Sequence, residues 1–389
     1  MRNTGKWKAL VAVLGAATLL LTSCANDTAP SPTSGSGSSG GFDAANYFKG
    51  KTIRFIVSHS AGGGADLTAR SFAASLGRLL PGNPRVTVTN DSGLGGINNA
   101  YAAPEADLVV GVTGLGSYLS QPLLDPENTY DPKGIQIVGA VTPEPRGALV
   151  TGDFAAKFPA LVDASGKDAP PIRFPATVGG PIDVVSEALI APWVCEKLKL
   201  PCQMLPVAED GSSDTDLMLQ RGEVNSNFTS IGSISRAHRQ ILDDGTGYVA
   251  FSYDDEGSEI TYPEGVKAPP HLADIIPADA KDQWAMIQPL ITGDGLGKTF
   301  WMGPKVPAEV VNALRQAWSD FINNKELYAP FEEIQTGGAG EGGISFTVQA
   351  LPGPDAQERF DASVNTFLAN LDAYKKLQTD IYTKYWATS

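Results

Sequence analysis

Short strand-forming runs alternate with amphipathic segments in the first part of the chain, and this order limits the possible folds more than any other feature. Residues 52–58 (TIRFIVS), 85–89 (RVTVT) and 107–113 (DLVVGVT) are short and rich in β-branched residues. Residues 66–80 place apolar side chains at helical spacing, and Pro81-Gly82 ends that segment. A β-α-β-α-β order predicts a parallel sheet with helices on both faces.

A second set of alternating segments follows. We expect strands over 135–141, 147–150, 172–176, 203–206, 224–228, 248–253 and 299–303, and helices over 96–103, 183–199, 215–221, 307–323 and 356–386. A chain of 389 residues is too long for one small core and favours two domains. The expected fold class is therefore α/β.

The N-terminus has the pattern of an export signal. Residues 1–23 carry three cations and no acid, and residues 9–21 are an apolar stretch too short for the roughly 20 residues of a bilayer span. Leu21-Thr22-Ser23-Cys24 resembles a bacterial lipobox, which implies cleavage before Cys24 and a diacylglycerol on its sulfur. An ordinary export signal with a chance cysteine is the alternative. Residues 24–43, rich in Ser, Gly and Pro, are expected to be a flexible tether behind the lipidated cysteine.

Two cysteines remain, Cys195 and Cys202. An exported chain meets oxidising conditions, so we expect a disulfide between them. Two free thiols are the alternative. No histidine lies near them in the sequence, and we expect neither a metal nor a cofactor.

The net charge of −14 argues against a nucleic-acid partner, because binding to phosphates needs a basic surface. Small anions are not excluded, since local amides and helix ends decide their binding.

A glycine-rich loop after the first expected strand is the best candidate for a binding site. It runs from Ser58 to Asp66 (SHSAGGGAD) and opens a helix. Three consecutive glycines let backbone N–H groups approach a ligand, and the helix N-terminus adds positive potential. This favours a carboxylate or a phosphate. The plainer alternative is a tight turn with Asp66 as a helix cap.

Several segments together resemble the solute receptors of tripartite tricarboxylate transporters, the Bug family. They are 53–70 (IRFIVSHSAGGGADLTAR), 90–103 (NDSGLGGINNAYAA), 108–114 (LVVGVTG), 130–132 (YDP) and 300–307, in the family's order. The resemblance covers roughly residues 50–385. It implies two Rossmann-like lobes joined by a hinge, as in type II periplasmic binding proteins, with a small carboxylate in the cleft. We assign residues 44–142 and 246–389 to lobe 1 and 143–245 to lobe 2.

The resemblance also implies the ligand-binding residues. They are Ser58, His59, Ser60, Ala61, Gly62, Gly63, Gly64 and Asp66 in the first loop; Thr113 and Gly114 after the third strand; Thr177, Val178, Gly179 and Gly180 in the second lobe; and Phe228 and Thr229. Ser58, His59 and Ser60 replace the family's Pro and aromatic residue, and Thr229 replaces a common Asp. These departures leave the ligand's identity open.

Two arginines and one motif need a separate interpretation. Arg70 lies a turn into the first helix, so a structural ion pair is expected rather than a ligand contact. Arg146, near the crossover between the lobes, is a weaker candidate for a ligand contact. Residues 292–299 (TGDGLGKT) approach a phosphate-binding loop, but Thr292 occupies its first glycine position and the segment precedes a strand.

The resemblance implies an exported, lipid-anchored receptor, at the outer face of the cytoplasmic membrane or in the periplasm, that passes a small organic acid to membrane transporter subunits. We expect a monomer and no enzymatic activity. A sensory lipoprotein of the same fold is the alternative. A secreted hydrolase would require a nucleophile beside a base, and no such pair is evident in the sequence.

Overall fold

The computed structural model describes residues 41–114, 130–152, 171–176, 178, 184, 186–207, 212–253, 260–263, 268–292, 296–336 and 344–387. Residues 42–389 form one compact unit. The expected tether and lipidation site, including Cys24, lie outside the described residues.

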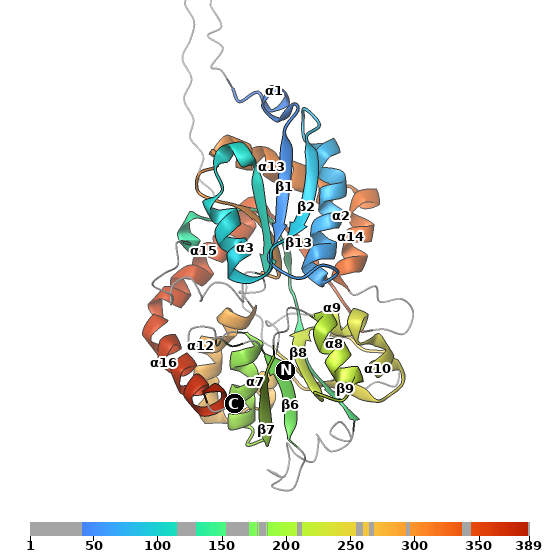
Figure 1. The fold of residues 1–389 in the computed structure, drawn as a ribbon, viewed down its shortest axis with the longest axis vertical. Helices are drawn as coiled ribbons and strands as arrows, with labels where there is room; N and C mark the ends of the chain where they lie inside the picture. The colour runs from blue at the N-terminus through green and yellow to red at the C-terminus, as the bar shows by residue number, and fades with distance from the viewer. Residues whose placement is uncertain are drawn as a thin grey trace, which may run out of the picture. The chain divides into compact units, whose positions relative to one another are not determined.

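A six-stranded mixed sheet is the centre of the first lobe (Figure 1). Its order is β13-β4-β11-β3-β1-β2. The strands are β1 (Thr52–Val57), β2 (Arg85–Asn90), β3 (Val109–Gly114), β4 (Gln136–Thr142), β11 (Lys298–Met302) and β13 (Gln349–Pro352). β1 is parallel to β2 and to β3, as the sequence predicts, whereas β11 is antiparallel to both β3 and β4.

Helices cover this sheet because their apolar stripes face it. Phe72 and Leu76 of the second helix are fully buried, and the helix ends before Pro81-Gly82, as expected. The helices of this lobe are α1 (Ala44–Phe48), α2 (Gly64–Leu79), α3 (Gly93–Ala102), α13 (Ala308–Ile322), α14 (Lys325–Gln335) and α15 (Gly353–Ala369), with 3₁₀ turns at Glu105–Asp107 and Pro132–Gly134. A two-stranded sheet pairs β10 (Ile260–Thr261) with β12 (Ser345–Phe346).

The second lobe contains two small sheets. One has the order β8-β5-β9 and the other pairs β6 with β7 in parallel. Their strands are β5 (Arg146–Thr151), β6 (Ile172–Ala176), β7 (Cys202–Pro206), β8 (Ser226–Ser230) and β9 (Gly247–Ser252). The helices are α7 (Glu187–Lys197), α8 (Ser212–Gln220), α9 (Ile231–Ala237), α10 (Arg239–Asp243), α11 (Leu272–Ile275) and α12 (Lys281–Thr292), with a 3₁₀ turn at Ala278–Ala280.

The C-terminal segment differs from the single long helix expected over 356–386. It forms α15, then α16 (Leu371–Ile381) and a π-helical turn (Tyr382–Trp386), with a break at Asn370. The apolar stripe continues across the break, which is why the sequence pattern does not show it. Tyr374 and Trp386 belong to the same core cluster as Trp193 of α7.

Residues 246–389 contribute helices and strands to both lobes. We expected residues 246–389 to return to the first lobe, and β11, α13, α14, β13 and α15 do so. In contrast, β9 pairs with β5, and α16 packs against the second lobe. Periodicity identifies a strand but not the sheet that it joins. The exact lobe boundaries remain a prediction.

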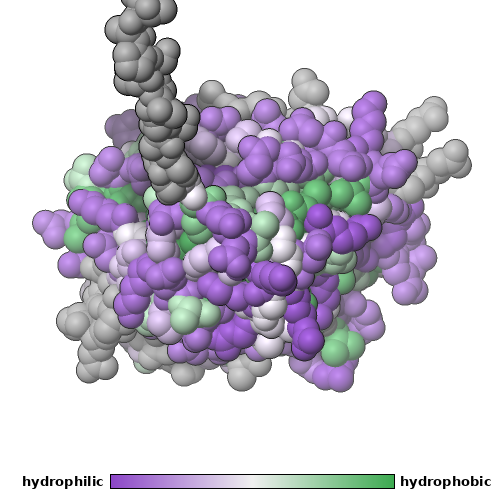
Figure 2. All heavy atoms as spheres, turned by 90° about the horizontal axis from the view of Figure 1, so that it is seen from above, coloured by the Kyte–Doolittle hydropathy of each residue, from purple (hydrophilic) through white to green (hydrophobic). Residues whose placement is uncertain are grey.

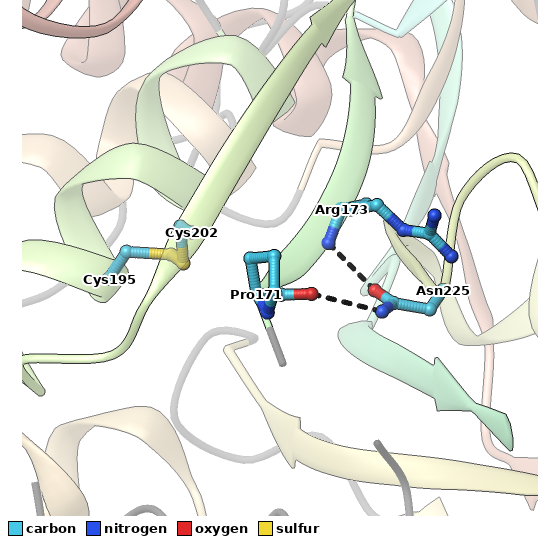
Figure 3. Close-up of a disulfide and its surroundings, with 5 residues drawn as sticks. All are labelled: Pro171, Arg173, Cys195, Cys202 and Asn225. Atoms are coloured by element: carbon cyan, nitrogen blue, oxygen red, sulfur yellow. Dashed lines mark hydrogen bonds between the residues drawn. A yellow bond between two sulfur atoms is a disulfide. The ribbon is translucent and has the colours of Figure 1, made fainter. Parts of the chain in front are cut away.

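The disulfide expected from the sequence is present (Figure 3). Cys195 at the end of α7 is bonded to Cys202 at the start of β7, with Cα atoms 6.1 Å apart. On the other side of β6, the Asn225 side chain accepts from the Arg173 N–H at 2.7 Å and donates to the Pro171 carbonyl at 3.1 Å. The disulfide and these bonds therefore hold the same end of the β6–β7 pair, where Ile172 lies opposite Cys202.

The surface is largely polar where it is described. Hydrophilic residues predominate on the face in Figure 2, and the large hydrophobic side chains that are exposed in the described part are Phe42 and Leu217. Within those residues, every helix is too short or too polar to span a bilayer.

Candidate ligand-binding site

The glycine loop joins β1 to α2 and is held in place from within. Gly62 has a φ of +81°, a conformation that favours glycine. Its N–H donates to Oδ2 of Asp66 at 2.9 Å. The cap of α2 is Gly63, so Asp66 is the third residue of the helix rather than its N-cap. Asp66 therefore fixes the loop and uses the Gly62 amide in doing so.

Arg70 is the partner of this aspartate, as expected. Its Nη2 lies 2.9 Å from Oδ1 of Asp66, and Asn90 Nδ2 donates to the same oxygen and to the His59 carbonyl, each at 3.0 Å. Burial acts to raise the pKa of Asp66, but the hydrogen bonds from Arg70, Gly62 and Asn90 outweigh it and lower that pKa. Asp66 is thus an anion that is already satisfied by the protein.

Two cations from opposite lobes meet at the first residue of α2. A methyl group placed on Gly64 would lie 3.1 Å from Nη2 of Arg236, on α9, and 3.8 Å from Nζ of Lys298, on β11. The first amides of a helix lack partners within it and carry partial positive charge. Three kinds of positive group therefore converge at Gly64, an arrangement that suits an anion.

Lys298 already has one carboxylate partner, Glu144. Lys298 Nζ lies 2.5 Å from Glu144 Oε1, and both side chains are about six-sevenths buried. Burial acts to raise the pKa of Glu144, but the positive charges of Lys298 and Arg146, together with the hydrogen bond from Lys298, lower it to about 2. Arg146 is itself paired with Glu187 at 2.6 Å. Each of these cations has a carboxylate of the protein beside it.

Arg236 differs from its neighbours. Its Nη1 donates to the Ile334 carbonyl at 3.4 Å, and among the described residues no carboxylate lies within ion-pair distance of it. Burial lowers the pKa of Arg236, and the negative charge of Glu144 only partly offsets this. The cluster of described residues therefore contains one positive charge more than its carboxylates neutralise.

A pocket opens beside this cluster, between the two lobes. It includes the Lys298–Glu144 pair and the last residue of α14, Gln335. Its lining is Val141, Pro143, Glu144, Ser230, Gly232, Lys298, Gln335, Phe346 and Val348.

The other predicted residues have different surroundings. Thr113 is buried at the end of β3 and its Oγ1 has no partner among the described residues, while Gly114 pairs with Lys298. Thr229 pairs with Gly147 in the second lobe. The ring of Phe228 packs in the second-lobe core against Phe251. Ligand contacts from all of these residues stay predictions. Val178 is half-buried against that core, and Thr177, Gly179 and Gly180 lie outside the described residues.

Three residues of the site were missed by sequence reasoning: Arg236, Lys298 and Gln335. Lys298 is in the segment dismissed as a phosphate-binding loop, and it does begin a strand, as that argument required. Arg236 and Gln335 are on α9 and α14, helices that we did not expect. A lysine at the start of a strand and an arginine on a short helix are too common to identify a site without the fold.

Buried His238 has an aspartate partner, as a catalytic base would, but its contacts in the described part of the chain are with Asp216 and Asn227, neither of which is a hydroxyl or thiol nucleophile. Nδ1 of His238 lies 2.8 Å from Asp216, and its Nε2 lies 3.0 Å from Nδ2 of Asn227. Because an amide nitrogen only donates, Nε2 accepts and Nδ1 carries the proton. Both ring nitrogens are used by structural partners, so this histidine stabilises the fold.

No family model matches the sequence, and no curated protein is similar to it. Solved structures are similar in fold. BugD, a periplasmic binding protein, is 15% identical with a TM-score of 0.56, covering 82% of this chain and 97% of its own. Rpa4515 from R. palustris, solved with adipate, is 16% identical with a TM-score of 0.57, covering 84% and 97%. MatC from Rhodopseudomonas palustris, solved with malate, is 17% identical with a TM-score of 0.54, covering 81% and 98%. The chain therefore has the two-lobed α/β fold of these periplasmic solute-binding proteins, and the resemblance to the Bug family is confirmed at the level of the fold.

Proposed function

We propose that this chain is an extracytoplasmic solute-binding lipoprotein that captures a small organic carboxylate between its lobes and delivers it to a tripartite tricarboxylate-type transporter. The observation that carries the proposal is the meeting of Arg236, Lys298 and the N-terminus of α2 at Gly64. This group of positive charges lies within a fold whose similar structures include proteins solved with malate and with adipate.

The source of each positive group suggests how ligand binding would affect the lobes. The α2 amides and Lys298 belong to the first lobe, whereas Arg236 is on α9 of the second. An anion held by both would draw the lobes together, so the bound state would differ from the free one in the angle between them. That difference is what a membrane transporter could recognise.

The role is proposed to be binding without catalysis. The described groups of the site are amides, hydroxyls, cations and the Glu144 carboxylate, and that carboxylate is bound to Lys298. The remaining parts of the proposal, namely a signal peptide over residues 1–23, a lipid on Cys24 and the transporter partner, rest on the sequence.

The test is thermal unfolding of the mature chain, starting at residue 24 with Cys24→Ser, against a panel of carboxylates at millimolar concentration. A ligand at 100 times its Kd stabilises the folded state by about 2.7 kcal/mol. With an unfolding entropy of about 2.1 cal/mol/K per residue, this raises the Tm by about 4 °C. A shift with carboxylates but not with matched amides supports the proposal. A flat panel from a folded protein contradicts it.

A further inference from the structure

Gln335, at the end of α14, lines the pocket and is only 4% exposed. Its Nε2 donates to Oγ1 of Thr68 at 2.8 Å, and Thr68 Oγ1 donates to the Gly64 carbonyl at 2.6 Å. A threonine hydroxyl has a single proton. Because that proton is used by Gly64, Thr68 can only accept from Gln335. The Gln335 amide is thereby oriented, with its nitrogen bound to α2 and its oxygen left over.

This oxygen, Oε1, is buried and has no hydrogen-bond partner among the described residues. Two polar neighbours in the pocket have other partners: Lys298 is bound to Glu144, and Ser230 Oγ donates to Ser233 Oγ at 3.0 Å. A buried acceptor without a donor is unfavourable, and native structures seldom keep one without a reason. The missing partner must be an N–H or O–H group.

Gln335, which carries the unpaired oxygen, lies close in space to the proposed carboxylate site. Arg236 Nη1 donates to the carbonyl of Ile334, the residue before Gln335. Gly232, on the same helix as Arg236, approaches the Gln335 carbonyl so closely that an added Cβ would lie 2.7 Å from it. A cation without a carboxylate partner and an acceptor without a donor therefore occupy one small region.

We propose that the pocket selects carboxylates that carry a hydrogen-bond donor, a hydroxyl or an ammonium, on a carbon near the carboxylate, and that Gln335 determines this specificity. The carboxylate binds at Arg236 and the α2 N-terminus, and the donor group binds Oε1 of Gln335. This inference rests on the proposed function and narrows its ligand class.

Matched acids that differ in one substituent test the proposal. Calorimetric titration of the mature chain, with Cys24→Ser, uses three series: propionate, lactate and alanine; succinate, malate and aspartate; glutarate, 2-hydroxyglutarate and glutamate. In the series of the right length, we expect the hydroxy or amino acid to bind about 10 to 100 times more tightly than the unsubstituted acid, which leaves Oε1 unpaired. Comparison of the two substituted acids distinguishes hydroxyl from ammonium.

The variant Gln335→Met removes the acceptor at similar side-chain size. We expect it to reduce the preference to less than about threefold, because the substituted and the unsubstituted acid then meet the same apolar side chain. The control is Gln378→Met, because Gln378 is equally buried but donates to the Val184 carbonyl away from the pocket. The control keeps the preference, and circular dichroism of both variants verifies folding.

The outcomes separate this inference from the proposed function. If carboxylates bind with no preference for a donor, or if Gln335→Met keeps the preference, the inference is wrong and the proposed function stands. If no acid of any series binds to the folded protein, both are overturned.

Discussion

Replacement of Arg236 by methionine tests the proposed site most directly. The guanidinium approaches the N-terminus of α2 and has no carboxylate partner among the described residues. A hydrogen bond to a charged group contributes about 1.5–3 kcal/mol. We take about 2 kcal/mol as the loss on removal of Arg236, which corresponds to a roughly 30-fold increase in Kd.

This loss has a measurable size in the thermal assay. A carboxylate present at 100 times the wild-type Kd would be at only about three times the Kd of Arg236→Met. Its stabilisation would then fall from about 2.7 to about 0.9 kcal/mol, and the Tm shift from about 4 °C to about 1 °C.

The stability of Arg236→Met without ligand is a second test of the same assignment. Burial lowers the pKa of Arg236, the negative charge of Glu144 only partly offsets this, and no carboxylate of the described residues lies within ion-pair distance. We therefore expect Arg236→Met to unfold at the same or a higher temperature than wild type without ligand. The control is Arg239→Met, since Arg239 forms an exposed ion pair with Asp243. Binding by Arg236→Met equal to wild type, or a large loss of stability without ligand, would refute the assignment of Arg236 to the ligand.

Three further predictions concern the disulfide, Glu144 and Gly232. Cys195 and Cys202 are seven residues apart, and reduction of their disulfide returns loop entropy to the unfolded chain. We expect the free energy of unfolding to fall by about 2.5 kcal/mol and the Tm by about 3 °C in a scan with dithiothreitol. An unchanged Tm in a protein with two titratable thiols contradicts this. The pKa of Glu144 is lowered to about 2 in the folded state, so the stability that its charge contributes is present above pH 4.5 and is lost as the pH falls toward 2. In denaturant titrations over that interval, the free energy of unfolding of wild type should fall by about 3 kcal/mol more than that of Glu144→Gln. Parallel pH curves for the two proteins argue against this. Gly232→Ala places a Cβ 2.7 Å from the Gln335 carbonyl, so we expect its free energy of unfolding in urea to fall by about 1–3 kcal/mol and its carboxylate binding to weaken. A variant as stable as wild type would show that the contact is loose.

The first lobe was largely predictable because its signals are local. β1, α2, β2 and β3 each carry their own periodicity or β-branched run, and the parallel order follows from their sequence. β10, β12 and β13 are two to four residues long, too short for any periodicity. The insertion of β11 between β3 and β4 depends on which edge is free in three dimensions, so no local pattern predicts it.

Some residues of the candidate site could likewise be predicted from local sequence, and others could not. Gly62, Gly63 and Gly64 can be recognised from the sequence, because three consecutive glycines at the start of a helix indicate an exposed and flexible backbone. Arg236 and Lys298 acquire their meaning from proximity to Gly64, which is more than 170 residues away along the chain. Charge alone does not distinguish them from the other Lys and Arg residues.

The place of β11 in the sheet has a consequence for how the protein folds. β4 is hydrogen-bonded only to β11 and β13 within its sheet, and both follow the second lobe in sequence. β1, β2 and β3 can pair through segments that are close in sequence, whereas the described sheet partners of β4 come from residues 298–302 and 349–352. Contacts over such long separations form slowly. The sheet of the first lobe is therefore completed only after the chain has returned from the second lobe, and we expect this closure to be a slow step of folding.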